Sequence, residues 1–417
     1  MIPVDIPAAE AQPETAETPL SFSEQVTARE RQYVLQNYAR YPLVLARGRG
    51  AWVYDAEGNR YLDLLSGIGV NALGHAHPRL LRVLREQAGL MIHISNLYYH
   101  EYQGRLAERL AQVSGLQRTF FCNSGAEAME GALKMVRAHG QSVNPDKYEV
   151  VALENSFHGR TIGALSITGQ PKYQKPFGPL MPGVKFIPMN DVAALEEAVS
   201  EWTAGIVLEP VQGEGGVFPV SESMLRKARE LADRHNAMLV FDEIQCGVGR
   251  MGTWFAYQGL DPIVMPDILT SAKPIGCGIP IGFVISNERA AKTLPAGMHG
   301  TTFGGGPLAT RVALEFMDVL EGLLPQIRER GEYFRHKLES LKNRYSFIKD
   351  VRVRGLMIGV ELDRPGKELV TECMKEGLLI NCTHEVVLRF LPPFIISESE
   401  IDKASRILSR VFKRWGA

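Results

Sequence analysis

Short apolar runs separated by longer amphipathic stretches fill the middle of this 417-residue chain, from about residue 118 to residue 286. Continuous apolar runs are typical of strands buried on both faces, and the stretches at 125–138 and 222–236 have helical spacing. Strands that alternate with helices predict an α/β fold around a mainly parallel sheet. The runs are TFFC (119–122), YEVVAL (148–153), VKFIP (184–188), GIVLE (205–209), AMLVFD (237–242), PDILTS (266–271) and GFVIS (282–286).

The pattern changes on both sides of this region. Residues 52–64 place aromatic and β-branched runs around a turn of Asp, Gly and Asn, which predicts a hairpin. Toward the C-terminus we expect one helix beginning near Pro307 and another over 326–343, followed by alternating segments of an antiparallel α+β layer. The domain joints are therefore predicted near residues 97 and 315.

Composition excludes several classes of protein. Basic residues number 46 and acidic residues 47, so the net charge of −1 gives no electrostatic reason to expect nucleic acid or an acidic membrane as a partner. The five cysteines include no CxxC pair, which argues against a disulfide framework or structural zinc. The first twenty residues hold four acids and no Lys or Arg, which predicts a disordered acidic tail rather than a signal peptide. With no apolar run of membrane-spanning length, we expect a soluble, cytoplasmic protein.

Polar and reactive side chains follow the predicted strands at the points where the strands end. In an open α/β sheet, ligands bind beyond the carboxyl ends of the strands. Their shared position therefore predicts one binding site at this edge of the sheet. The segments are Asn123–Glu127, Ser156–Arg160, Glu209, Asp242–Gln245 and Ala272-Lys273.

Each of these segments also has a purely structural interpretation. Ser124, Gly125 and Ala126 open a helix, where free N–H groups favour a phosphate, yet an ordinary Ser N-cap explains this motif as well. Lys273 is either a Schiff-base amine or a solvated loop residue. Asp242 ends an apolar strand and needs a partner, which is either a protonated ring nitrogen or a structural donor.

Metal and dinucleotide motifs are incomplete in the sequence. His75 and His77 lie two residues apart with no third ligand, so we expect no metal site. Gly276-x-Gly278 fails as a dinucleotide motif because Ile281 stands where the third glycine belongs.

Eight longer motifs occur along the chain: YPLVLARGRGAWVYDAEGNRYLDLLSGIGVNALGHAHP, NSGAEAMEGALKMVR, SFHGRT, LEPVQGEGGV, DEIQCGVGRMG, TSAKPIGCGIPIG, HGTTFGGGP and LRFLPPF. In their order and spacing they resemble the class III pyridoxal-phosphate aminotransferases, most closely the acetylornithine aminotransferases, from about residue 29 to the C-terminus. The resemblance implies fold type I, with a large, mainly parallel-sheet domain and a smaller α+β domain built from both chain ends. We expect the acidic tail at 1–20, an N-terminal segment of the small domain at 21–97, the large cofactor domain at 98–315 and the C-terminal small domain at 316–417.

The resemblance implies a role toward pyridoxal phosphate for most of the strand-end residues. Lys273 resembles the lysine that holds the cofactor and moves the substrate proton, and Asp242 resembles the partner of the pyridine nitrogen. Phe157 is similar to the residue that stacks on the ring. The remaining cofactor residues are the phosphate cradle of Ser124, Gly125 and Ala126, the 3-oxygen partner Gln245 with Glu243 and Ile244 beside it, and Thr302, which reaches the phosphate of a neighbouring subunit.

Substrate residues follow from the same resemblance. Arg389 resembles the arginine that grips a substrate carboxylate, and Glu209 resembles the acid that masks this arginine while the amino donor is bound. Arg160 resembles a second arginine, which holds the α-carboxylate of an acylated ornithine, and Thr301 lies beside the substrate. A site shared between two chains implies an obligatory homodimer.

The resemblance thus implies a ping-pong transaminase of arginine biosynthesis, which transfers the δ-amino group of N2-acetylornithine to 2-oxoglutarate and yields N-acetylglutamate 5-semialdehyde and glutamate. Other ω-amine donors stay open: ornithine, succinylornithine, succinyldiaminopimelate, acetyllysine-type compounds and γ-aminobutyrate. The alternative from another class is a silent binding protein on the same fold, against which the intact lysine and aspartate argue. The chain departs from the family pattern at Met129, Cys246, Pro274 and Gly306, none of which is assigned to the chemistry.

Overall fold

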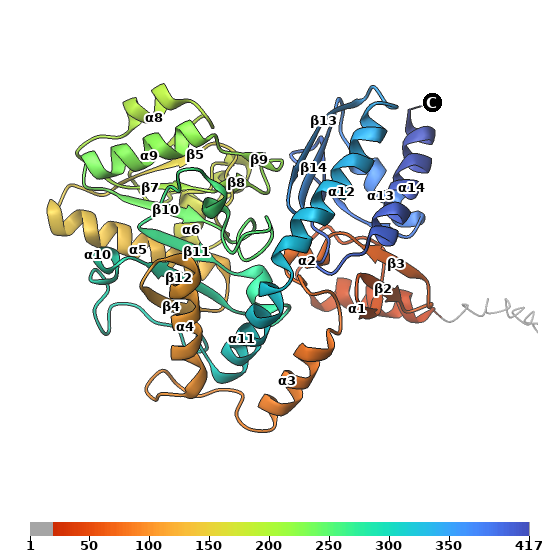
Figure 1. Cartoon of the computed structure of the whole chain (residues 1–417), viewed down its shortest axis with the longest axis horizontal. Coiled ribbons are helices and arrows are strands. Elements are labelled where there is room, and N and C mark those ends of the chain that lie inside the picture. Colours follow the sequence, from red (N-terminus) through yellow and green to blue (C-terminus); the bar gives the residue numbers. More distant parts are fainter. Residues whose placement is uncertain (1–19, 417) are drawn as a thin grey trace, which may run out of the picture. The chain divides into compact units, whose positions relative to one another are not determined.

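The computed structural model describes residues 20–416 (Figure 1), so the acidic tail predicted at 1–20 lies almost entirely outside the described residues. The chain divides into two compact units. The first holds the residues up to Arg47 together with Tyr54–Arg60, and the second holds Gly48–Val53 and the chain from Tyr61 onward.

Helix α1 (Phe22–Tyr33) belongs to the first unit. It begins after Ser21, whose Oγ accepts a hydrogen bond from Glu24 N (3.3 Å) while Ser21 N donates to Glu24 Oε2 (2.8 Å). This reciprocal cap satisfies N–H groups that a helix start leaves open. In the same unit Asp55 Oδ1 accepts from Asn59 N (2.7 Å), which closes the turn expected inside residues 52–64. The chain passes between the units within β1 (Leu45–Arg49), β2 (Trp52–Asp55) and β3 (Arg60–Asp63).

A seven-stranded sheet dominates the second unit, and each of the apolar runs expected as a strand contributes to it. Its order is β4-β12-β11-β10-β7-β5-β6. Neighbours from β11 to β6 are parallel, whereas β12 is antiparallel to both β11 and β4. The predicted mainly parallel α/β fold is therefore confirmed. The strands are β4 (Arg118–Cys122), β5 (Glu149–Leu153), β6 (Val184–Ile187), β7 (Thr203–Leu208), β10 (Met238–Asp242), β11 (Ile268–Ser271) and β12 (Gly282–Ser286).

Both faces of this sheet are buried under helices. Along β10, Met238 and Val240 join the core cluster that contains residues of α5 (Gly125–Val143). The alternate residues of β10, such as Phe241, join the cluster that contains residues of α9 (Glu222–Arg234). Figure 1 shows these two helices on opposite sides of the strands. The strands are apolar on both faces because neither face meets water.

A second sheet of four antiparallel strands lies near the C-terminus, in the order β13 (Ile348–Arg354), β14 (Met357–Leu362), β17 (Val387–Phe390) and β16 (Asn381–Thr383). Its strand β17 (Val387–Phe390) places Arg389 opposite Gly359 of β14. The helices α11 (Pro307–Glu321) and α12 (Leu324–Lys342) agree with the two expected from the sequence. The α+β layer is thus present, while the domain boundaries near residues 97 and 315 stay predictions.

The other helices are mostly short connections, and none of the helices between residues 20 and 416 has both the length and the hydropathy needed to span a bilayer. They are α2 (Ser66–Gly69), α3 (Pro78–Ala88), α4 (Glu101–Ser114), α6 (Ile162–Ser166), α7 (Pro171–Gln174), α8 (Val192–Ala198), α10 (Glu288–Ala291), α13 (Lys367–Lys375) and α14 (Glu398–Trp415). The other strands are β8 (Val211–Gln212), β9 (Phe218–Pro219), β13 (Ile348–Arg354), β14 (Met357–Leu362), β15 (Leu378–Leu379) and β16 (Asn381–Thr383).

Candidate active site

A cavity of about 440 Å³ opens at the carboxyl ends of the parallel strands, where the sequence predicts a binding site. It brings together most of the predicted residues, although they are spread over 150 positions of the chain. The predicted residues that line it are Ser124, Gly125, Ala126, Phe157, Arg160, Glu209, Asp242, Ile244, Gln245 and Lys273. The lining also includes Val70, Asn123, His158, Glu214 and the segment 278–281, which the sequence argument did not assign.

The start of α5 forms one wall of the cavity. Ser124 caps this helix, since its Oγ accepts from Glu127 N (3.2 Å), so the structural interpretation of this serine is confirmed. The first-turn N–H groups that follow, at Gly125 and Ala126, have no acceptor within the helix and favour an anion. A Cβ at position 125 would lie 2.8 Å from Ile244 Cδ1, so only glycine fits there. This cradle therefore suits a phosphate.

Asp242 lies at the end of β10 with 3% of its surface exposed, and both of its oxygens are hydrogen-bonded. Oδ1 accepts from Ile244 N (3.0 Å), and Oδ2 accepts from His158 Nδ1 (2.7 Å). Each carboxylate oxygen can accept more than one hydrogen bond, so Asp242 keeps acceptor capacity toward the cavity that it lines. The buried carboxylate of Asp242 requires partners, and one of them is the imidazole of His158.

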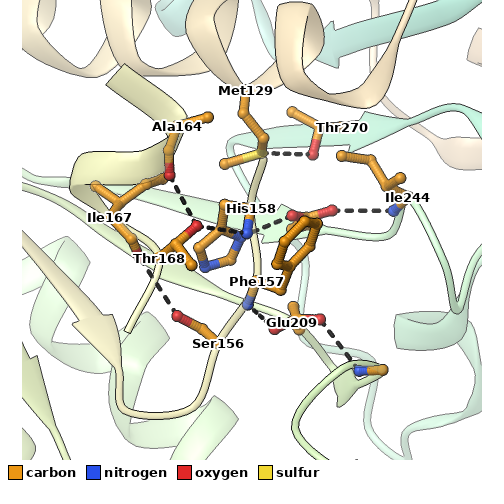
Figure 2. Close-up of polar contacts among 12 residues, drawn as sticks. Met129, Ser156, Phe157, His158, Ala164, Ile167, Thr168, Glu209, Ile244 and Thr270 are labelled. Carbon is orange, nitrogen blue, oxygen red and sulfur yellow. Dashed lines mark hydrogen bonds and ion pairs between the residues drawn. The ribbon is translucent and has the colours of Figure 1, made fainter. Parts of the chain in front are cut away.

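His158 is almost fully buried, with 1% of its surface exposed where it lines the cavity, and Figure 2 shows its surroundings. Its backbone N–H donates to Thr168 Oγ1 (3.0 Å), and the Thr168 hydroxyl donates to Ala164 O (2.9 Å). Burial lowers the pKa of His158, but the hydrogen bond and charge of Asp242, with the charge of Glu209, outweigh burial and raise that pKa above its ordinary value. The imidazolium is therefore stabilised beside Asp242.

Lys273 follows β11 and faces the same cavity. Its backbone has a φ of +43°, in the left-handed region that L-residues seldom occupy, and such strain concentrates at functional sites. Burial lowers the pKa of the Lys273 amine below its ordinary value, against the opposing charge of Glu214. A larger share of neutral amine makes this lysine a better nucleophile and base.

Arg389 lies behind the cavity lining and is fully buried. Its Nη1 donates to Glu214 Oε1 (2.6 Å) and to Gln245 Oε1 (3.0 Å), and its Nε donates to Asn381 Oδ1 (3.2 Å). Burial raises the pKa of Glu214, but the charges of Arg389 and Lys273 and the hydrogen bonds to Glu214 lower it to below its ordinary value. Glu214 is therefore the acid that masks Arg389 in this structure.

Glu209 does not mask Arg389, so the expected pairing was wrong. Its two oxygens instead accept from the backbone N–H groups of Phe157 (3.0 Å), as Figure 2 shows, and of Gly213 (3.2 Å). Burial raises the pKa of Glu209 to about 7, against the lowering effect of His158. Glu209 directly follows β7, and its side chain is held by neighbouring backbone, whereas Glu214 lies farther along the chain and reaches Arg389.

Three other predicted residues lie away from the cavity lining. Glu243 is fully buried and accepts from Ala256 N (2.5 Å) and Tyr257 N (3.0 Å), and its role beside the cofactor stays a prediction. Burial raises the pKa of Glu243 to about 8. Thr301 lines a separate cavity of about 300 Å³, and Thr302 is exposed, so their roles toward a partner subunit stay predictions.

The residues that sequence reasoning missed were present in motifs it had used. Glu214 belongs to LEPVQGEGGV, from which only the strand-ending Glu209 was assigned. His158 belongs to SFHGRT, between the two residues that were assigned. His75, considered for a metal, instead contacts Asp63 Oδ2 through Nε2 (2.9 Å).

Fold and site together define an α/β enzyme of fold type I, in which a strand-end aspartate and a lysine after the next strand face one cavity. The chain belongs to the class-III aminotransferase family, whose model, described as "Aminotransferase class-III", matches residues 33–412. The family expected from the sequence is thereby confirmed.

Individual relatives agree with this assignment. An acetylornithine aminotransferase of Methanocaldococcus jannaschii is 49% identical over 386 residues, 92% of this chain and 96% of that protein. A Pseudomonas aeruginosa protein named succinylornithine transaminase/acetylornithine aminotransferase is 42% identical, over 89% of this chain and 93% of its own. The ornithine aminotransferase of Toxoplasma gondii has a TM-score of 0.90 at 36% identity, over 95% of this chain and 96% of its own. A second structure of that enzyme contains pyridoxal phosphate at partial occupancy in its active site.

Proposed function

We propose that this chain is a pyridoxal-phosphate-dependent aminotransferase that transfers the δ-amino group of N2-acetylornithine to 2-oxoglutarate. The products are N-acetylglutamate 5-semialdehyde and glutamate, and the step belongs to arginine biosynthesis. The observation that carries the proposal is the placement of Lys273 and Asp242 on one cavity whose neighbouring arginine, Arg389, is masked by Glu214. The name and 49% identity of the Methanocaldococcus relative support the choice of donor.

The cavity residues fit the cofactor. The N–H groups of Gly125 and Ala126 suit its phosphate, and the glycine is required because Ile244 leaves no space for a side chain. Asp242 would hold a protonated ring nitrogen, and Phe157 would cover the ring face. When bound, pyridoxal phosphate supplies an electron sink that stabilises negative charge on the carbon beside the amine.

Lys273 holds and moves the proton in this scheme. Its amine faces the cavity, and its lowered pKa leaves a neutral form available to take a proton from the substrate carbon and return it one position away. The hydrogen bond from His158 fixes the orientation of the Asp242 carboxylate. The enclosing strands and loops exclude water, which strengthens the electrostatic interactions among these charged groups.

The two arginines sort the two substrates. Acetylornithine carries its amine far from its only carboxylate, which Arg160 would bind at the exposed side of the cavity. The uncharged carbons near the reacting amine require no second cation, so Glu214 stays on Arg389 in this half-reaction. A 2-oxoglutarate carboxylate would displace Glu214 and bind Arg389 through its planar fork.

Succinylornithine is the second candidate donor, because the name of the Pseudomonas relative includes it at 42% identity. It has the same δ-amine and an additional carboxylate on the acyl group. The two donors are separated by the ratio of their kcat/KM values in single half-reactions on the purified enzyme. A ratio above one for acetylornithine supports the proposal, and a ratio well below one assigns the succinylated donor.

A homodimer with shared active sites is also part of the proposal. Thr302 is exposed. Large apolar side chains are exposed beside it in the sequence, and others are exposed in the segment 90–99. Leu97 is 84% exposed, Tyr99 is fully exposed and Phe303 is 65% exposed. A second copy would cover such a surface, since large apolar patches mark protein interfaces. The cytoplasmic location stays a prediction from the sequence.

A further inference from the structure

Arg160 stacks on an aromatic side chain from a neighbouring short helix. Its guanidinium carbon lies 3.8 Å from the ring centroid of Tyr173, in α7, and 5.3 Å from that of Phe157. The two rings meet edge to face, with centroids 6.4 Å apart and an interplanar angle of 84°. A guanidinium over an aromatic face is attracted by the ring quadrupole. The two aromatic residues therefore form a platform for one arginine.

Among residues 20–416, which the structure describes, the platform is the only partner of the Arg160 guanidinium, since no hydrogen bond or ion pair holds it. The contact between the positive charge and the ring face occupies none of the five N–H donors of the guanidinium. Those donors consequently stay available for a carboxylate that enters the cavity. An exposed arginine without such support would lose more side-chain freedom on binding a ligand.

Helix α7 is attached to the segment 156–165, which carries Arg160 and the start of α6. On one side of Tyr173, Gln170 Nε2 donates to Ser156 O (3.1 Å). On the other side, Gln174 Nε2 donates to Leu165 O (3.1 Å). Both acceptors are backbone carbonyls of the segment 156–165. Tyr173 is therefore held at a fixed place relative to Arg160.

We propose that Tyr173 is a positioning residue that orients Arg160 toward the cavity and thereby makes the enzyme selective for donors whose carboxylate is far from the reacting amine. The inference rests on the proposed function, because it assigns Arg160 to the donor carboxylate. It adds a residue that does not line the cavity itself. The acceptor half-reaction depends on Arg389, which lies in β17 of the second sheet. Tyr173 should therefore affect only the half-reaction of the amino donor.

The test compares Tyr173→Leu with Tyr173→Phe in separate half-reactions of the holoenzyme. Loss of a cation–π contact of about 1 kcal/mol predicts that Tyr173→Leu raises the KM for acetylornithine roughly fivefold, with kcat nearly unchanged. With 1,4-diaminobutane, an amine without a carboxylate, and with glutamate, kcat/KM should stay within about twofold of wild type. Tyr173→Phe keeps the aromatic face and should behave as wild type. Should the Leu variant fold poorly, Tyr173→Met replaces it, because Met fills the space without a π face.

A matched control is Lys172→Gln, since the Lys172 ammonium also lies over the Tyr173 ring, 4.9 Å from its centroid. Removal of this cation leaves the platform for Arg160 intact, so the acetylornithine KM should change by less than twofold. The inference is overturned if Tyr173→Leu leaves the acetylornithine KM unchanged, or if it weakens glutamate and acetylornithine equally. A wild-type enzyme that does not turn over acetylornithine at all would instead contradict the proposed function.

Discussion

His158 Nδ1 lies 2.7 Å from Asp242 Oδ2, and neither side chain is more than 3% exposed. His158 thus influences what binds in the cavity through its contact with the Asp242 carboxylate. Among the described residues, its Nε2 is buried without a hydrogen-bond partner, so the contact with Asp242 is the main polar contact of the ring. The hydrogen bond from His158 orients the carboxylate that we assign to the cofactor nitrogen.

Replacing His158 with Gln should lower kcat by roughly 10- to 100-fold, because a hydrogen bond to a charged group contributes about 1.5–3 kcal/mol. The readout is kcat for both half-reactions, together with the pH dependence of the cofactor absorbance. Because Asp242 serves both half-reactions, the two should fall together.

The control for this variant is His139→Gln. His139 is also buried, and its Nε2 contacts Asn236 O (3.0 Å), but it does not line the cavity. This change should lower the thermal midpoint and leave kcat unchanged. A His158→Gln enzyme with wild-type kcat would show that His158 does not contribute to catalysis.

Substitution of Glu214 should alter the balance between the two substrates. In Glu214→Gln, Arg389 loses its ion pair and is open to carboxylates at all times. We expect the ratio of kcat/KM for acetylornithine to that for glutamate to fall about tenfold, which corresponds to about 1.4 kcal/mol. Half-reaction kinetics with each amino donor measure this ratio.

Glu209→Gln is the matched variant, because both glutamates line the same cavity and only Glu214 contacts Arg389. Its ratio of the two donors should stay within about twofold of wild type. If Glu209→Gln shifts the ratio and Glu214→Gln does not, then the masking role returns to Glu209.

The pH dependence of stability should report on Glu243. Burial raises its pKa in the folded state to about 8, above the ordinary value of 4.5. Between these values the folded chain keeps a proton that the unfolded chain has released, so this residue makes the free energy of unfolding fall as pH rises toward 8. The largest possible slope from one group is about 1.4 kcal/mol per pH unit.

Urea unfolding of wild type and Glu243→Gln at several values between pH 5 and pH 9 measures this contribution. The Gln variant cannot titrate, so its stability should fall less steeply over that range. Because Glu209 and His158 are present in both proteins, their contributions cancel in the difference. Parallel pH profiles would show that Glu243 does not hold the extra proton.

A mixing experiment tests the proposed sharing of active sites. Thr302→Glu should impair cofactor binding in a partner by placing a negative charge beside the phosphate, and Lys273→Ala should abolish catalysis in its own chain. If Thr302 serves the partner, heterodimers of these two inactive variants contain one intact site. Unfolding and refolding the mixture should then restore up to about a quarter of wild-type activity, whereas a site built from one chain restores none.

The fold followed from the sequence because burial on both faces leaves a continuous apolar run for each strand of the large sheet. The site could be predicted because parallel strands bring their carboxyl ends to one edge, and this topology alone places Asp242 and Lys273 at one cavity. Glu243 lies away from the cavity lining because adjacent residues at a strand end point in opposite directions, a periodicity that the sequence already contains.

The choice between Glu209 and Glu214 depended on information that local sequence does not contain. Both lie in one short motif, and their contacts are decided by how a loop after β7 meets β17, 175 positions away from Glu214. The same holds for Tyr173, whose ring meets Arg160 only because two glutamines attach α7 to the loop. Long-range packing of this kind has no periodic signal in the chain.

The most direct measurement is product formation by the purified holoenzyme with N2-acetylornithine and 2-oxoglutarate, in parallel with Lys273→Ala. We predict equal amounts of glutamate and N-acetylglutamate 5-semialdehyde from the wild-type enzyme, and a rate at least about a thousandfold lower from the variant. Turnover of another ω-amine in place of acetylornithine would contradict the assigned donor. Wild-type rates in Lys273→Ala would contradict the chemistry assigned to this site.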